Sequence, residues 1–412
     1  MEDWEFVGED TQYATHGLHP YPARMIPQVA RRLIKKYLIE YLPPPYLQYV
    51  VFDPFCGSGT VLAEARLLGV NAIGIDLNLL AVIIAKTKVD PPNPRDIEDV
   101  LPHILQRLQN DTSRTEAIKI LGYGNIDYWF KPDIIKELAR IKEILDGSIR
   151  NVKIRNFFNL CLSLTARKVS NIYREGDTYI KRMKLEDLKK HNPNVYKIFN
   201  EVVIEKLKNV KDFYSRLNDY QDTSAEIIWA NTLACCIRDK SVDLIVTSPP
   251  YGEEKNTVSY TRWSKISLYW LTKNQDVVKN MEKSMLGHRN SKRFINPPPS
   301  RTLNEILNNV EKQYKCHDLV LDVEAFFEDY YKALKIMFNV LKNNRYCCIV
   351  IGNRSIKQER IPMDKVTIEF AEHIGFKHEA TFYRRLPTKA LPWECGKGKT
   401  ISNENIVILK KE

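Results

Sequence analysis

The 412-residue sequence lacks the features of a secreted, membrane-spanning or metal-binding chain. No apolar run approaches the roughly 20 residues that a membrane span needs, and the acidic start MEDWEFVGED contains no basic-then-apolar signal. The eight cysteines form no CxxC pair, and the two adjacent pairs cannot close a local disulfide without strain. His16 and His19 have no further ligands at metal spacing, so packing or a ligand contact suits them better than zinc. We therefore expect a reduced, cytoplasmic chain without a metal or a membrane partner.

The composition is that of a folded protein with a large core. The sequence is 44% hydrophobic and contains 21 tyrosines. Its length suits one large α/β domain with insertions, or two domains. Lys and Arg outnumber Asp and Glu by 62 to 51, giving a net charge of +11. That excess favours a polyanionic partner but does not demand one.

Short β-type runs alternate with helical patterns along much of the chain. Several of the runs are apolar throughout, as strands covered on both faces should be. Helical patterns occupy 60–69, 325–342 and 364–375. The seven candidate strands are 49–53, 72–76, 226–230, 243–247, 345–351, 379–384 and 405–410. This alternation predicts a parallel, doubly wound α/β sheet.

Two segments interrupt the alternation. Residues 91–222 have a helical pattern and are far too long for an ordinary crossover, which predicts an inserted subdomain. Within it, residues 151–220 carry 15 Lys or Arg against 8 Asp or Glu. The second segment, 275–320, contains GHRNSKRFINPPPSR and is typical of an exposed basic loop. The segments 1–90, 223–274 and 321–412 remain for the α/β domain.

A glycine-rich turn follows the first candidate strand, in VVFDPFCGSGT (50–60). Gly57 and Gly59 allow a tight turn and close approach to a ligand, and a helix opening at Thr60 offers unpaired N–H groups. Asp76 ends the next strand, where a carboxylate can accept hydrogen bonds from ribose hydroxyls. The third glycine of GxGxxG and the GK[ST] pattern are both absent, so a nucleoside cofactor fits better than a dinucleotide or a triphosphate. The alternative is a purely structural turn that Asp53 caps.

The stretch Ser248-Pro249-Pro250-Tyr251 follows the apolar run 243–247. Two consecutive prolines fix φ and remove two backbone donors, which makes the loop stiff. The loop stands at the carboxyl end of a strand, where α/β sheets bind ligands. There it can hold the Ser248 hydroxyl and the Pro249 carbonyl as acceptors for an NH₂ group. Tyr251 offers a flat face to a planar base, and such stacking is worth about 1–3 kcal/mol.

With DPFCGSGT and TSPPYG, the sequence resembles the S-adenosylmethionine-dependent amino-methyltransferases of DNA, which methylate cytosine N4 or adenine N6. HGLHPYPARMIPQ (16–28) resembles the segment that in this family closes over the methionine part of the cofactor. The order of the motifs is similar to the arrangement in which the target-recognition region lies between them. The resemblance implies a Rossmann-like seven-stranded methyltransferase sheet with a mainly helical inserted subdomain. The catalytic domain would comprise 1–90, 223–274 and 321–412, with 91–222 as the candidate target-recognition region.

The resemblance also implies roles for individual residues. Ser248, Pro249, Pro250 and Tyr251 would contact the target amine and its base. Asp76 would hold the cofactor's ribose, and Asn231 stands where the family has a polar residue at the cofactor's adenine. The remaining candidate cofactor contacts are His16, Tyr21, Arg24, Asp53, Phe55, Gly57, Gly59 and Thr60. For Arg24 the alternative of a solvated arginine at the start of a helix is equally consistent with the sequence.

Basic residues interleaved with aromatics are typical of a nucleic-acid surface. They occur in LTARKVSNIYREGDTYIKRMK (164–184) and after the SPPY stretch. The candidates are Arg167, Lys168, Arg174, Lys181, Arg182, Tyr260 and Arg262. A solvated helical face explains 164–184 equally well. An amine inside a paired duplex is reached only by flipping the base out, which requires a stacking pocket and contacts to phosphates.

These observations predict a site-specific DNA methyltransferase that transfers a methyl group from S-adenosyl-L-methionine to the N4 amine of a flipped-out cytosine. Serine at the first position of the motif is, in the family, the form more often linked to cytosine N4. Double-stranded DNA would be the substrate, and a cognate restriction enzyme a partner in a restriction-modification or defence system. Three alternatives remain: an adenine-N6 DNA methyltransferase, an RNA exocyclic-amine methyltransferase, and a non-catalytic DNA-binding relative.

Overall fold

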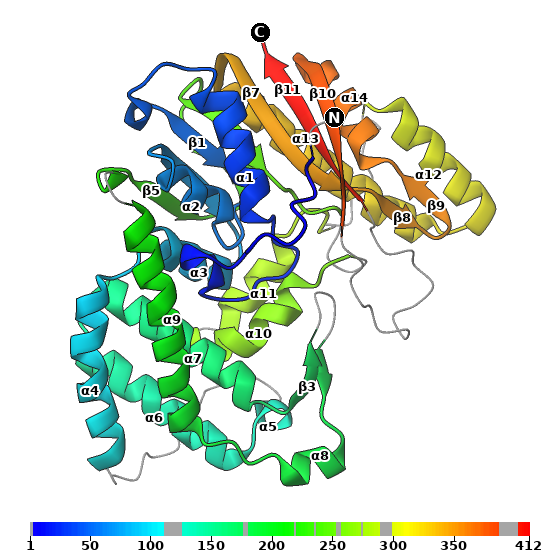
Figure 1. The fold of residues 1–412 in the computed structure, drawn as a ribbon. Coiled ribbons are helices and arrows are strands. Elements are labelled where there is room, and N and C mark those ends of the chain that lie inside the picture. Colours follow the sequence, from blue (N-terminus) through cyan, green and yellow to red (C-terminus); the bar gives the residue numbers. More distant parts are fainter. Residues whose placement is uncertain are drawn as a thin grey trace.

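A single seven-stranded sheet forms the centre of the computed structural model (Figure 1). The structure describes residues 3–110, 126–175, 180–217, 220–234, 236–252, 257–272, 275–288, 299–386 and 403–412. The strand order is β10-β11-β7-β6-β1-β2-β5. The strands are β1 (Val50–Asp53), β2 (Asn71–Asp76), β5 (Ala225–Trp229), β6 (Val242–Thr247), β7 (Leu341–Gly352), β10 (Phe376–Arg385) and β11 (Asn403–Lys411). Each of the seven predicted runs coincides with one of these strands, so the predicted seven-stranded Rossmann-like sheet is confirmed.

The sheet is mixed, and the prediction of a wholly parallel sheet is wrong at one strand. β5, β2, β1, β6 and β7 pair in parallel. β11 lies antiparallel both to β7 and to β10. An antiparallel neighbour needs no crossover helix, and the sequence between β10 and β11 shows no helical pattern. The reversal places the first residues of β11 at the edge where β6 and β7 end.

Helices cover both faces of the sheet. On one face pack α1 (Pro27–Ile34), α2 (Thr60–Arg66) and α3 (Leu79–Val89), and on the other α12 (Arg301–Tyr314), α13 (His317–Val340) and α14 (Met363–Ile374). The alternation of side chains along β7 shows why its sequence is apolar throughout. Cys348 points into the first core and Cys347 into the second. These adjacent cysteines therefore face opposite layers, and both are free thiols.

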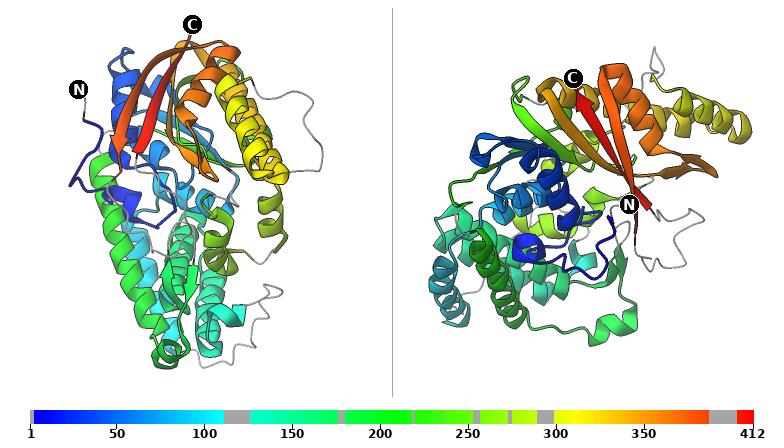
Figure 2. Two further views of the ribbon diagram at one scale, coloured as in Figure 1. Left: turned by 90° about the vertical axis from the view of Figure 1, so that its right-hand side faces the viewer. Right: turned by 45° about the horizontal axis from the view of Figure 1, so that its top comes forward.

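The helical insertion gathers at one end of the molecule, away from the outer strands β10 and β11 (Figures 1 and 2). It contains α4 (Pro94–Asn110), α5 (Ile126–Trp129), α6 (Pro132–Ser148), α7 (Val152–Val169), α8 (Leu185–Lys190), α9 (Val195–Leu217) and the hairpin β3 (Ile172–Glu175) with β4 (Ile180–Arg182). These elements bury a core of their own around Phe157, Phe158 and Phe199. The helix α10 (Tyr260–Leu271) joins that core through Ile266 and Trp270, so it links the chain that follows β6 to the insertion.

Residues 275–320, predicted as a basic loop, are largely helical where the structure describes them, in α11 (Gln275–Lys283) and α12. The middle of GHRNSKRFINPPPSR, residues 289–298, lies outside the described residues. The small hairpin of β8 (Arg354–Ile356) and β9 (Glu359–Ile361) follows β7. Short turns of helix complete the fold: η1 (Ala14–Gly17), η2 (Lys35–Ile39), η3 (Tyr46–Gln48) and η5 (Thr232–Ala234). Among the described residues, no helix has the length and apolar character to span a membrane.

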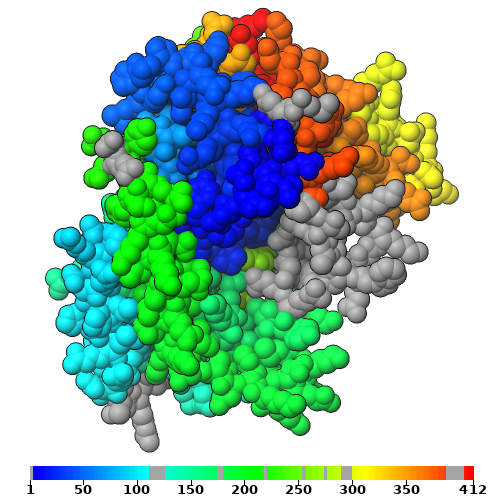
Figure 3. All heavy atoms as spheres, viewed as in Figure 1, coloured from blue at the N-terminus to red at the C-terminus, as the bar shows by residue number. Residues whose placement is uncertain are grey.

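The N-terminal segment lies over the junction between the sheet and the insertion (Figure 3). It is anchored to α9 because Asp212 accepts a hydrogen bond from the Ala14 amide at 2.6 Å, and Lys206 donates to the Gly17 carbonyl at 2.8 Å. The segment that follows η1 is thereby held against the carboxyl edge of the parallel strands.

Candidate active site

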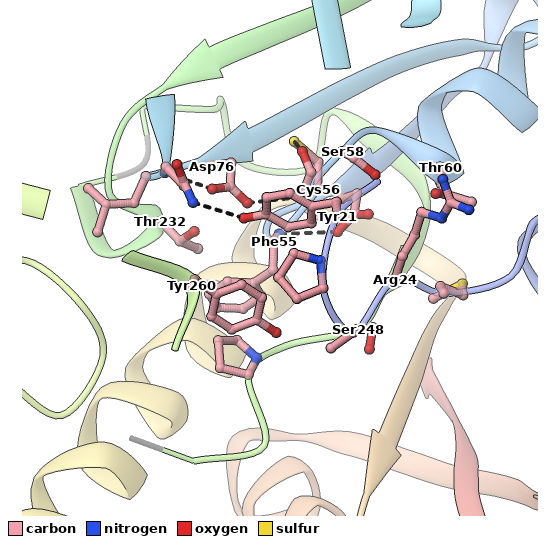
Figure 4. Close-up of a pocket in the computed structure, with 18 of the residues that line it drawn as sticks. Tyr21, Arg24, Phe55, Cys56, Ser58, Thr60, Asp76, Thr232, Ser248 and Tyr260 are labelled. Carbon is pink, nitrogen blue, oxygen red and sulfur yellow. Dashed lines mark hydrogen bonds between the residues drawn. The ribbon is translucent and has the colours of Figure 1, made fainter. Parts of the chain in front are cut away.

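A cleft lies at the carboxyl edge of the parallel strands, where β1, β2, β5 and β6 end (Figure 4). It spans about 910 Å³, its solvent-open part included. Its walls come from residues 21–25, the β1–α2 turn, the end of β2, residues 231–232, the loop after β6, Tyr260 and residues 284–286. The structure thus brings together the two motifs that are nearly 200 residues apart in sequence.

The glycine-rich turn is built by backbone hydrogen bonds to the end of β2. The Cys56 amide donates to the Ile75 carbonyl at 2.9 Å, and the Gly57 amide donates to Asp76 Oδ2 at 2.8 Å. Gly57 lines the cleft and has φ +49°. Gly59 does not line it. At φ +77°, a Cβ on Gly59 would stand 2.9 Å from the Cβ of Ala85, so this glycine allows α2 to approach α3.

Two carboxyl groups at the strand ends flank this turn and line the cleft. Asp53 Oδ1 accepts from the Thr247 hydroxyl at 2.6 Å and from the Phe55 amide at 3.1 Å. Asp76 Oδ1 accepts from the Asn78 amide at 2.8 Å. Burial raises the pKa of Asp53 to about 7 and that of Asp76 to about 6. Because Asp76 also accepts from the Gly57 amide, it holds the turn in place while still facing the cleft.

The cleft suits a nucleoside whose other end is charged. Thr60 lines it, and the buried Thr60 hydroxyl has no hydrogen-bond partner among the described residues, as expected of a group that awaits a ligand. Phe55 and Leu77 add apolar surface, and Asp76 adds an acceptor. These donors, acceptors and apolar walls fit the ribose, the purine and the charged methionine end of S-adenosylmethionine.

The N-terminal segment closes one side of the cleft. Tyr21 and Arg24 both line it, and Arg24 donates to the His16 carbonyl at 2.6 Å. His16 itself is fully buried away from the cleft, where its Nε2 lies 2.7 Å from Glu64. Burial lowers the pKa of His16 to about 4, so the ring is neutral at neutral pH and donates to the carboxylate. His16 thus positions the segment rather than lining the cleft.

Asn78, which the sequence reasoning missed, links three walls of the cleft. Its Oδ1 caps α3 by accepting from the Leu80 amide at 3.0 Å. Its Nδ2 donates to the Tyr21 hydroxyl at 3.1 Å and to Ser264 Oγ, in α10, at 2.8 Å. Its place just after Asp76 at a helix start was the available signal.

Asn231 lines the cleft beside a wall that no sequence signal predicted. Its Nδ2 donates to the Ser284 carbonyl at 3.0 Å, and its Oδ1 accepts from the Leu233 amide at 2.9 Å. Ser284, Met285 and Leu286 complete that wall. Both polar atoms of the Asn231 side chain are thus hydrogen-bonded to protein backbone. Asn231 therefore shapes the wall of the cleft at the place where the family resemblance predicts a contact with the adenine.

The SPPY loop divides between the cleft and the core beneath it. Ser248 and Pro250 line the cleft, whereas Pro249 is buried and Tyr251 packs partly against the core of α13. The Tyr251 hydroxyl donates to Glu404 Oε1 at 3.1 Å and lies 3.5 Å from Ser248 Oγ. Tyr260, rather than Tyr251, lines the cleft, together with Tyr21 and Phe55, and its ring stacks on that of Tyr21 at a centroid distance of 5.9 Å.

The residues predicted to bind nucleic acid fall into different environments. Arg167 is buried in α7, with its guanidinium carbon 3.8 Å from the centre of the Trp263 ring and NH1 donating to the Trp263 carbonyl at 3.0 Å. It therefore joins α7 to α10 and does not face solvent, contrary to the expectation for it. Lys168 is half exposed and lies 3.5 Å from Glu205.

The others lie around the β3–β4 hairpin and the start of α10. Lys181 and Arg262 are exposed. Arg182 donates to the Tyr128 carbonyl at 2.8 Å and packs over the Tyr128 ring. Arg174 belongs to β3, but its side chain lies outside the described part of the structure. Within the described ranges, no group of three or more His, Cys, Asp or Glu side chains could hold a metal ion.

Comparison with known proteins connects this site to one class of enzyme. A family model described as DNA methylase, N6_N4_Mtase, matches residues 3–87, which contain the segment before α1, the glycine-rich turn and Asp76. The Type II methyltransferase M.MvaI of Kocuria varians is 29% identical over 423 residues, covering 98% of this chain and 91% of that protein. The Type II methyltransferase M.MjaII of Methanocaldococcus jannaschii is 26% identical over 220 residues, which are 52% of this chain and 37% of that protein.

A solved structure of a SAM-dependent methyltransferase from Methanosarcina mazei aligns with 91% of this chain and 96% of its own, at 12% identity and a TM-score of 0.33, which is too low to support a conclusion. The sequence relatives and the cleft that the two motifs form point to the same class of enzyme without this solved structure. The family match and the Type II methyltransferase relatives support placing this chain among the amino-methyltransferases of DNA, with S-adenosylmethionine as the cofactor.

Proposed function

We propose that this DNA methyltransferase methylates the N4 amine of cytosine within a specific double-stranded sequence. The observation that carries the proposal is the position of Ser248 and Pro250 at the end of β6, in the same cleft as Asp53, Gly57 and Asp76. A target amine and a methyl donor held in this cleft would be neighbours. Serine at the first position of the loop is the form that the family links more often to cytosine N4.

The stiff loop would prepare the amine for attack. The lone pair of an aromatic amine is delocalised into the ring, so acceptors that draw its hydrogens out of the ring plane raise its nucleophilicity. The Ser248 hydroxyl and the Pro249 carbonyl are the acceptors we assign to this task. When bound, S-adenosylmethionine supplies an electrophilic methyl group on a sulfonium. Alignment of two held reactants can contribute about 7–11 kcal/mol in ideal intramolecular cases.

Other residues would hold the cofactor, the flipped base and the DNA phosphates. Asp76 accepts from the ribose, and Asp53, Gly57 and Thr60 surround the methionine end. Tyr260 is the aromatic ring whose position in the cleft suits stacking on the flipped base. Lys181, Arg182 and Arg262 supply phosphate contacts from the hairpin and from α10, and Arg167 is left out of this set because it is buried. Residues 91–222 would carry most of the sequence recognition.

We further propose that the protein is the modification enzyme of a restriction-modification system with a cognate restriction enzyme. Its Type II methyltransferase relatives support this assignment. We expect the protein to be produced together with a nuclease that cleaves the same DNA sequence when that sequence is unmethylated.

Nucleoside analysis tests the reaction and the base together. The protein is incubated with S-adenosylmethionine and mixed-sequence duplex DNA, the DNA is digested, and the nucleosides are compared with standards by mass spectrometry. We expect N4-methylcytosine. Ser248→Ala should bind S-adenosylhomocysteine as the wild type does and lose most turnover, because it deletes an acceptor but leaves the glycine-rich turn intact.

Other outcomes would point elsewhere. N6-methyladenine would retain the mechanism and correct the base, since the same loop serves both amines in the family. Methylation of RNA in parallel reactions, with none of DNA, would overturn the substrate. A protein that binds the cofactor and methylates neither would be the non-catalytic relative.

A further inference from the structure

The hydroxyl of Tyr251 forms its hydrogen bond beneath the cleft rather than in it. It donates to Glu404 Oε1 at 3.1 Å, and the other carboxylate oxygen of Glu404 accepts from Arg384 at 2.7 Å. The Arg384 side chain is 6% exposed and that of Glu404 14% exposed. The chain of contacts therefore runs from a buried arginine, through a carboxylate and a phenol, to Ser248 Oγ, 3.5 Å from the phenol.

The mixed topology of the sheet makes this chain possible. Glu404 stands at the start of β11 and pairs with Gly352 at the end of β7. Because β11 is antiparallel, its first residues reach the carboxyl edge of the sheet, beside the loop that follows β6. Arg384 pairs directly with Glu404 across β10 and β11. A parallel β11 would have put Glu404 at the opposite edge.

The hydrogen bonds that link Arg384, Glu404, Tyr251 and Ser248 can run in only one direction from donor to acceptor. Arginine only donates and an ionised carboxylate only accepts. The single proton of the Tyr251 hydroxyl is therefore used on Glu404, and its oxygen can only accept from Ser248. Once Ser248 donates toward Tyr251, its lone pairs are left for the cleft. In that orientation the Ser248 hydroxyl can accept a hydrogen bond from an NH₂ group in the cleft, because its own proton already points toward Tyr251.

We propose that Glu404, fixed by Arg384, is a positioning residue that orients the Ser248 hydroxyl through Tyr251 as an acceptor for the target amine. This inference rests on the proposed function of the same cleft. It assigns to the first residues of β11 a task that the motif itself does not contain. It also gives the Tyr251 hydroxyl a role separate from any stacking of its ring.

Glu404→Gln tests the direction with little change in shape. Arg384 needs an acceptor, so it should turn the glutamine oxygen toward itself and leave the NH₂ group facing Tyr251. Tyr251 would then donate to Ser248, and the Ser248 proton would point into the cleft. We expect kcat for DNA methylation to fall about tenfold or more. The KM for DNA and the affinity for S-adenosylhomocysteine should stay within about twofold of the wild type.

Tyr251→Phe provides the second arm, since it deletes the hydroxyl and retains the ring. It should reproduce the kcat loss, and the double variant with Glu404→Gln should be no slower than the slower single variant, because both changes act on one chain. Glu379→Gln is the matched control. It makes the same substitution at an exposed position of β10 and should leave kcat unchanged.

The possible failures are distinguishable. An active wild type whose Glu404→Gln variant retains full kcat, or in which the losses of the two variants multiply, overturns the inference alone. A fall in melting temperature together with weaker S-adenosylhomocysteine binding would make Glu404 a purely structural residue and also overturn it. A wild type that methylates no nucleic acid overturns the proposed function and the acceptor role with it.

Discussion

Asp53 and Asp76 illustrate how a residue at a strand end can hold a turn in place and still face a cleft. Both carboxyl groups face the cleft, and burial raises the pKa of Asp76 to about 6 and that of Asp53 to about 7. Ionised carboxylates are stronger acceptors for ribose hydroxyls than neutral carboxyl groups, and they also attract a cationic cofactor. The affinity for the cofactor should therefore depend on pH in a range where most carboxylates have finished titrating.

We predict that S-adenosylhomocysteine binds more weakly as the pH falls from about 8 to about 5, because protonation removes these acceptors. Calorimetric titration across that range measures it. Asp76→Asn should bind about 10- to 100-fold more weakly at neutral pH, the loss of a hydrogen bond to a charged group. Its remaining pH dependence should centre near the pKa of Asp53. A flat affinity profile for the wild type would contradict this assignment.

The same carboxyl groups reduce the stability of the ligand-free protein. A folded-state pKa above the unfolded value means that the folded state binds protons more tightly, so the free energy of unfolding falls as the pH rises from about 4 to about 7. Asp53→Asn retains an oxygen for the Thr247 and Phe55 donors without the buried charge. Its melting temperature should exceed that of the wild type by about 2 °C or more at pH 8.

At about pH 4 to 5, where Asp53 is protonated, the two melting temperatures should converge. His16 and His19 do not disturb the comparison at neutral pH, because burial lowers their pKa values to about 4 and about 3. Equal melting temperatures at both pH values would show that Asp53 carries no buried charge in the folded state.

At the scale of the element, the approach of α2 to α3 fixes the glycine-rich turn. Gly59→Ala would force a positive φ on alanine and place its Cβ 2.9 Å from the Cβ of Ala85. We predict a loss of about 1–3 kcal/mol in the free energy of unfolding, together with weaker cofactor binding as the turn shifts. Denaturant unfolding and calorimetry measure the two effects.

Gly147→Ala is the control for that substitution. Gly147 lies near the end of α6, and a Cβ there would meet nothing within 4 Å. Alanine at that position should be neutral or stabilising, because it lowers the entropy of the unfolded chain. If Gly59→Ala were as harmless as Gly147→Ala, close helix packing would not explain the glycine.

At the scale of the whole molecule, the net charge of +11 must be distributed so that DNA reaches the cleft. We predict that replacing both Lys181 and Arg262 with Glu weakens duplex binding and lowers the dependence of log K on log salt by about one for each phosphate that the variant no longer neutralises. Lys377→Glu is the control, since Lys377 lies near the start of β10, at the edge of the sheet opposite to the cleft. Equal salt slopes for all three proteins would place the DNA on another face.

Much of the fold could be predicted because it is encoded locally. Buried strands are short apolar runs whatever their neighbours are, so all seven were found. The two site motifs depend on backbone conformations that only Gly and Pro favour, and Asp76 is marked by its place at a strand end. The orientation of β11 was mispredicted, because an apolar run has the same pattern in parallel and antiparallel sheets.

The roles of single side chains in the insertion were beyond the sequence. Arg167 has the charge of a phosphate-binding residue, and nothing nearby in sequence reveals that Trp263, 96 residues later, covers it. Asn78 and residues 284–286 line the cleft through contacts between distant segments. Burial of this kind depends on which helices meet, and that is settled only when the whole chain packs.

By itself, the sequence determined the class of fold, the glycine-rich turn and the stiff Ser-Pro-Pro-Tyr loop, since each follows from strand periodicity or from the conformational preferences of Gly and Pro. Only the tertiary structure decided which charges are buried, which aromatic rings line the cleft and which edge of the sheet receives the start of β11. Those outcomes depend on pairings between residues far apart in the chain. The hydrogen bond of Tyr251 with Glu404, across 153 residues, is one of them.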